Sequence, residues 1–72
     1  MKENQKLIFS IERLSEGLEV FGALVAVNGI SAMQLFPKAN AETYLSEAAK
    51  KIEAAVGEIN RAIDVINNDT AA

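Results

Sequence analysis

Three glutamates, Glu12, Glu16 and Glu19, follow one another at steps of four and three residues. Carboxylates with this spacing share one face of a helix, where together they could attract a hard cation. A calcium ion takes about six to eight oxygen ligands, and three side chains on one exposed face do not supply them. We therefore expect a solvated acidic face here and no metal site.

The residue types on which most catalytic sites depend are missing from the chain. It contains no histidine and no cysteine, so Ser–His and Cys–His arrangements are excluded. The di-iron sites of helix bundles need Glu-x-x-His, and the four scattered glycines form no phosphate-binding loop. We expect no catalytic residue, no cofactor and no enzymatic activity.

The basic residues offer a second kind of chemistry, the binding of nucleic acid. Lys2, Lys6 and Arg61 would converge if the two ends of the chain lay together. The formal net charge, however, is −3 and the pI is about 4.8. Because an acidic surface repels phosphate, the sequence argues against a nucleic-acid partner.

Residues 41–67 are expected to form a helix, with Asn40 as its N-cap. Branched aliphatic residues and alanines each recur every seven residues, which is the spacing of an a/d seam between packed helices. Alanine favours helix and allows a neighbouring helix to come close. The seam of this helix consists of Leu45, Ala48, Ile52, Ala55, Ile59, Ala62 and Ile66, preceded by Ala41.

A first helix is expected over about residues 6–28, followed by a short helical turn at about 32–36. The pair Asn28-Gly29 is typical of a helix end, and Pro37 ends helical structure in any case. One continuous helix to Leu35 is the alternative. The apolar residues of this helix alternate steps of four and three, giving a seam of Leu7, Ile11, Leu14, Leu18, Phe21 and Val25.

The two helices match in length, so the predicted fold is a single all-α domain: an antiparallel hairpin over residues 1–72 with a tail at 68–72. Such a chain is too short to bury a large core, and without cysteine it has no disulfides, so we expect a homodimer that forms a four-helix bundle. This layout resembles the Rop-type bundle. From Val20 to Phe36 no residue is charged, and the surplus apolar surface predicts an oligomer contact at Val20, Ala23, Leu24, Val27 and Ile30.

These features favour a non-enzymatic interaction protein of the cytoplasm that binds itself and a further protein partner, as an adaptor, inhibitor or regulator. The N-terminal segment is too short and too acidic for a secretory signal. The first alternative is a membrane-active protein that inserts residues 20–36, although this stretch is shorter than the roughly 20 residues of a bilayer span. The second alternative is a Rop-like hairpin that binds nucleic acid, which the net charge disfavours.

Overall fold

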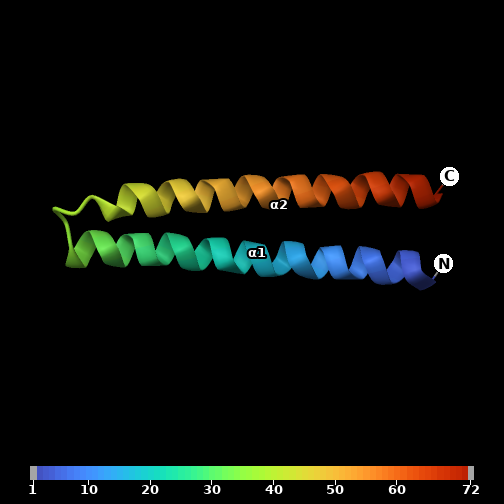
Figure 1. Cartoon of the computed structure of the whole chain (residues 1–72), viewed down its shortest axis with the longest axis horizontal. Helices are drawn as coiled ribbons and strands as arrows, with labels where there is room; N and C mark the ends of the chain where they lie inside the picture. The colour runs from blue at the N-terminus through green and yellow to red at the C-terminus, as the bar shows by residue number, and fades with distance from the viewer. Residues whose placement is uncertain (1, 72) are drawn as a thin grey trace.

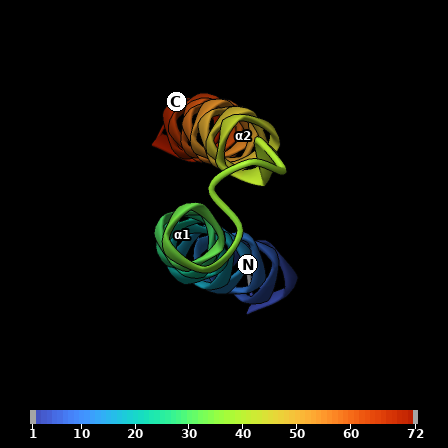
Figure 2. The same cartoon turned by 90° about the vertical axis from the view of Figure 1, so that its left-hand side faces the viewer.

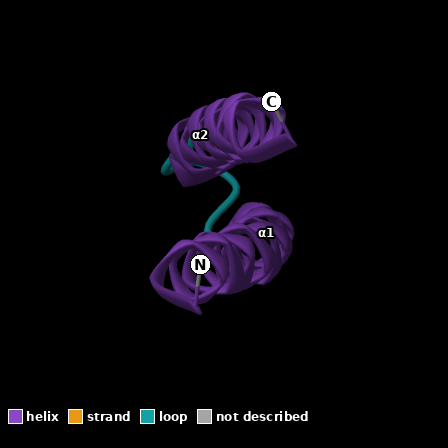
Figure 3. Cartoon of the chain, turned by 90° about the vertical axis from the view of Figure 1, so that its right-hand side faces the viewer, coloured by secondary structure: helices purple, strands orange, loops and turns teal. Residues whose placement is uncertain are grey.

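Two long antiparallel helices make up the chain, joined by one short connection (Figure 1). A computed structural model describes the backbone of residues 2–71 and the side chains of residues 3–69. Helix α1 spans Lys2–Leu35 and helix α2 spans Ala41–Ala71. Seen from either end, the helices lie side by side, with both termini at the end opposite the connection (Figures 2 and 3). The expected all-α hairpin of two packed helices is confirmed.

Helix α1 continues through Asn28-Gly29, where we expected it to end, and reaches Leu35 as in the continuous alternative. Gly29 does not adopt the left-handed conformation that would end a helix, because no glycine of the described backbone has a positive φ. The side-chain amide of Asn28 donates a hydrogen bond to the Leu24 carbonyl at 2.8 Å, within the same helix. No separate helical turn therefore forms over residues 32–36.

The connection reverses the chain within five residues, from Phe36 to Asn40. The Ala39 N–H donates to the Phe36 carbonyl at 3.0 Å, which places Pro37 at the second position of a β-turn, where its fixed φ is favourable. Asn40, directly before α2, has a φ of 58° and accepts a hydrogen bond from the Thr43 hydroxyl at 3.1 Å. The second helix then runs to Ala71, whereas we expected a tail from residue 68; residue 72 lies outside the described residues.

The hairpin is long and thin, with extents of 55 × 16 × 10 Å for its Cα atoms. Its radius of gyration is 16.6 Å, whereas a compact chain of this length would have about 11 Å. Each helix packs against one other helix, so the neighbour can cover at most one side of it. As a result, none of the apolar side chains described at residues 3–69 is fully buried.

Candidate interaction surfaces

The contact between the helices follows one line of residues on each helix. On α1 the buried and half-buried positions alternate steps of three and four, as in a coiled-coil pair: Ile8, Ile11, Ser15, Leu18, Gly22, Val25, Gly29 and Ala32. On α2 half-buried residues with the same alternation are Leu45, Ala49, Ile52, Val56, Ile59, Ile63 and Ile66, and Ala41, Glu42, Ser46, Ala48 and Ala55 are half-buried beside them.

Part of the seam expected from the sequence lies on this line, and part lies beside it. Ile11, Leu18 and Val25 of α1 lie in the contact, together with the branched residues Leu45, Ile52, Ile59 and Ile66 of α2. Three bulky residues of the expected seam, Leu7, Leu14 and Phe21, are instead 54, 61 and 56% exposed. The alanines Ala48 and Ala55 are half-buried at the edge of the contact, and Ala62 is exposed. Relative to the expected seam, α1 presents smaller residues to α2.

Small residues on α1 explain this orientation. A Cβ atom built on Gly22 would lie 2.9 Å from Cγ2 of Ile52, and one built on Gly29 would lie 3.3 Å from Cβ of Leu45. Glycine at these two positions therefore permits α2 to approach closely. Gly17 and Gly57, in contrast, face open space. A pattern based on apolar side chains misses such contacts, because glycine and serine do not contribute to it.

Ser15 is the one buried polar side chain among those described, with 6% of its surface exposed. Its hydroxyl donates a hydrogen bond to Oδ1 of Asn60 at 2.8 Å and thereby joins the two helices. A buried hydroxyl needs such a partner, since leaving it unpaired costs free energy. The sequence patterns did not predict this pair; a serine within an apolar stripe was the available signal.

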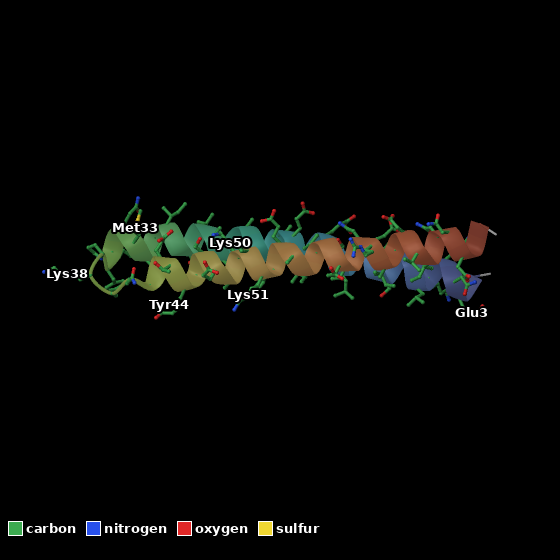
Figure 4. All side chains as sticks on the ribbon, turned by 90° about the horizontal axis from the view of Figure 1, so that it is seen from above. Glu3, Met33, Lys38, Tyr44, Lys50 and Lys51 are labelled. Atoms are coloured by element: carbon green, nitrogen blue, oxygen red, sulfur yellow. The ribbon has the colours of Figure 1, made fainter. Side chains whose placement is uncertain are left out.

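The bulky residues and the alanines lie on the same side of the hairpin. Leu7, Leu14 and Phe21 each precede a contact position of α1, and the alanines each precede a half-buried position of α2. In an antiparallel pair, the residues that come one position before a contact residue lie on the same side of the pair in both helices. We call this side the lateral face; it comprises Leu7, Leu14, Phe21, Asn28, Leu35, Ala41, Ala48, Ala55 and Ala62. Tyr44 and Lys51 border it, and Figure 4 shows both on the edge opposite Met33.

A second apolar surface lies on α1 outside the line of contact with α2. It consists of the residues expected to form the oligomer contact, Val20, Ala23, Leu24, Val27 and Ile30, and we call it the outer patch. Each of its four large side chains is more than half exposed, and Ala23 is exposed as well. The structure thus brings these five residues together on one free surface of the single chain.

The side of the hairpin opposite the lateral face carries a groove of about 550 Å³ between the helices. Its apolar lining includes Ala26, Gly29 and Ile30 of α1 and Ala49 and Val56 of α2. Charged residues also line it: Glu19, Glu42, Lys50 and Glu53. An adjoining hollow toward the chain termini is lined by Glu12, Ser15, Glu16, Glu19, Asn60, Ile63 and Asp64. This side is therefore acidic as well as apolar.

The structure places the charged residues considered in the sequence on different parts of the hairpin. Glu12, Glu16 and Glu19 border the same hollow, but in the described part of the chain no group of three or more Asp, Glu, His or Cys residues could hold a metal ion. Lys6 and Arg61 are exposed, and the side chain of Lys2 lies outside the described residues. The Arg13 guanidinium lies over the Phe9 ring, 5.5 Å from its centroid.

The chain was also compared with known proteins. No protein-family model, no curated protein and no solved structure matches it. What the protein does is therefore inferred from its own surfaces.

Proposed function

We propose that this chain is a non-enzymatic interaction protein that self-associates and acts through protein–protein contacts, as an adaptor, inhibitor or regulator. The observation that carries the proposal is the exposure of its apolar residues. Among the side chains described at residues 3–69, thirteen large apolar ones are exposed, and ten of them belong to α1. An apolar surface of this extent usually marks an interaction site, because monomeric soluble proteins rarely expose large contiguous apolar patches.

The total surface area supports the same proposal. A compact monomer of 7.7 kDa exposes roughly 4,300 Å², as judged from the scaling of surface with mass. The chain exposes 5801 Å². Its surface therefore exceeds that of a compact monomer by roughly 1,500 Å². Covering this excess with a second chain would supply the core that the single hairpin lacks, and a four-helix bundle is the simplest assembly that does so.

Sedimentation of the purified protein at micromolar concentration tests self-association. We expect a highly helical species no smaller than a dimer. A stably folded monomer under these conditions would contradict the proposal, since a single hairpin buries too little apolar surface to be stable alone.

Insertion into a membrane is the second candidate function, and the hydropathy of α1 favours it. The stretch Glu3–Leu35 is long and apolar enough to cross a bilayer, and its most apolar window has a mean hydropathy of 1.5. By length and composition alone this is weak evidence.

Two features oppose insertion into a membrane. The uncharged stretch Val20–Phe36 is about 26 Å long as a helix, compared with a hydrocarbon thickness of about 30 Å. In addition, α2 lies alongside and carries Glu42, Glu47 and Glu53, which would enter the lipid with it.

Cell fractionation separates these two functions. If the protein acts in the cytoplasm through protein contacts, it remains in the high-speed supernatant of expressing cells in the absence of detergent. Recovery only after detergent extraction would favour the membrane function. Binding to nucleic acid, the remaining alternative, would require a gel shift that weakens steeply with salt, and the net charge of −3 opposes it.

A further inference from the structure

The two broad sides of the hairpin differ sharply in charge. None of the residues that make up the lateral face is charged, and Asn28 is the one polar residue among them. Asp69 follows Ala62 by seven residues and continues the same row at the terminal end. The corresponding positions on the opposite side include Glu12, Glu19 and Glu53. Burying these carboxylates against a second copy would desolvate them beside like charges, which is strongly unfavourable. Of the two broad sides, only the lateral face can be covered by a copy of itself without this cost.

We propose that a second copy of the chain covers the lateral face with its own lateral face. This inference rests on the self-association proposed above and names the surface that carries it. With the lateral face included, each helix presents a stripe of three positions in seven, which is the stripe width of helices in a bundle core. The stripe runs along a molecule 55 Å long, so that the contact would extend over nearly its whole length.

The area supports a stable dimer. Two separate copies expose 5801 Å² each, and a compact particle of twice the mass would expose roughly 7,200 Å², so two copies that packed into such a particle would bury up to roughly 4,400 Å² in total. Obligate homodimers bury about 2,000–5,000 Å² or more. The estimated burial therefore falls within the range of permanent assemblies.

The shape of the lateral face also suits a helical partner. Bulky Leu14 and Phe21 project from α1 beside a row of alanines on α2. Between these two residues the surface is hollowed over Gly17, with Ser10, Arg13 and Leu18 as the other lining residues. A second copy brings both features, side chains that project and spaces that receive them, which is how bundle helices interlock.

Matched substitutions on α2 test the proposal. Ala62 lies on the lateral face and Ala54 on the outer side of the helix, and both are exposed in the single chain. Ala62→Glu is expected to dissociate the dimer, or to unfold it by dissociation, whereas Ala54→Glu should keep the wild-type size in sedimentation. An Ala62→Glu variant with the wild-type size and melting temperature would overturn the proposal.

Thiol labelling provides a readout that does not depend on disrupting the fold. The chain has no cysteine of its own, so Ala62→Cys and Ala54→Cys each introduce a single thiol. In a monomer both would react with a maleimide at similar rates. The proposal predicts that the Cys at position 62 reacts at least about tenfold more slowly than the Cys at position 54 in the dimer, because the partner covers it. Equal rates in a protein that sediments as a dimer would overturn it.

The outer patch supplies the competing location. If a second copy covered the outer patch instead, Ala23→Glu would dissociate the protein and Ala62→Glu would not; that result overturns the lateral-face contact while leaving self-association intact. A wild-type protein that is monomeric would instead refute self-association itself. With the lateral face covered, Ala23→Glu is expected to sediment as a dimer.

Discussion

Replacing Gly22 with alanine tests how closely the two helices approach. The new Cβ would lie 2.9 Å from Cγ2 of Ile52, closer than real Cβ atoms come to other heavy atoms. Isoleucine has two heavy atoms on its Cβ and one strongly preferred rotamer in a helix, so this methyl group cannot easily turn away. Gly22→Ala must therefore move the helices apart or force Ile52 into an unfavourable rotamer.

Two opposing contributions determine how much Gly22→Ala changes the free energy of unfolding. In a helix interior, glycine to alanine stabilises by about 1 kcal/mol when the new methyl group meets nothing. Gly17 is such a site, because nothing lies within 4 Å of a Cβ built there. Overpacking at Gly22 costs about 1–3 kcal/mol, so Gly22→Ala should be neutral or destabilising by up to about 2 kcal/mol. The free energies of unfolding of the two variants should therefore differ by about 1–3 kcal/mol.

Urea denaturation followed by helical circular dichroism measures this difference. All variants are compared at the same protein concentration, since association contributes to apparent stability. Ile52→Leu provides a second background in which to measure Gly22→Ala, because leucine has a single carbon on its Cβ and can leave the Cγ2 position empty. In the Ile52→Leu background, Gly22→Ala should cost at least about 1 kcal/mol less than in the wild type.

The reasoning fails if Gly22→Ala stabilises the protein as much as Gly17→Ala does. That result would show that Ile52 does not approach Gly22, and that the face α1 turns toward α2 is different from the one described. Full additivity of Gly22→Ala with Ile52→Leu would lead to the same conclusion.

Three further predictions follow from individual contacts. Ser15→Ala should destabilise by about 0.5–1.5 kcal/mol, and adding Asn60→Ala should cost little more in a double-mutant cycle if the two side chains bond only to each other. Ala55→Leu should destabilise by about 1–3 kcal/mol and Ala54→Leu by less than about 0.5 kcal/mol; equal effects in urea denaturation would contradict the half-buried and exposed positions of these two alanines. Asn40→Ala should cost about 1–2 kcal/mol because of its φ of 58°, whereas Asn40→Gly should be milder, as measured by thermal melting.

The sequence by itself determined the elements and their order. Apolar spacing at steps of three and four residues predicted both helices, and Pro37 predicted the reversal between them, because a proline and its preceding residue resist helical geometry. The matching lengths of the two segments then led to an antiparallel hairpin. These inferences depend only on local backbone chemistry and on the period of the helix, so no tertiary information was required.

The end of the first helix was not determined locally. Asn28-Gly29 has the composition of a helix end, yet α1 passes through it. A Cβ at Gly29 would lie 3.3 Å from Cβ of Leu45, closer than ordinary van der Waals contact, so this glycine allows a close approach of the helices instead of ending one of them. Both uses of glycine follow from its missing side chain. Only the presence of α2 beside it decides between them.

The tertiary structure also decided which edge of the apolar stripe on α1 faces α2. The stripe is wide, and its bulky members Leu14 and Phe21 predicted the contact at the wrong edge. The helices instead meet along Ser15, Gly22 and Gly29, where small side chains let the backbones come close and a hydrogen bond to Asn60 forms. Helical periodicity gives the direction of each side chain but not the distance between helices. That distance depends on the residues of both helices at once. Because the helices meet along the small residues of α1, the bulky residues Leu7, Leu14 and Phe21 remain exposed on the lateral face.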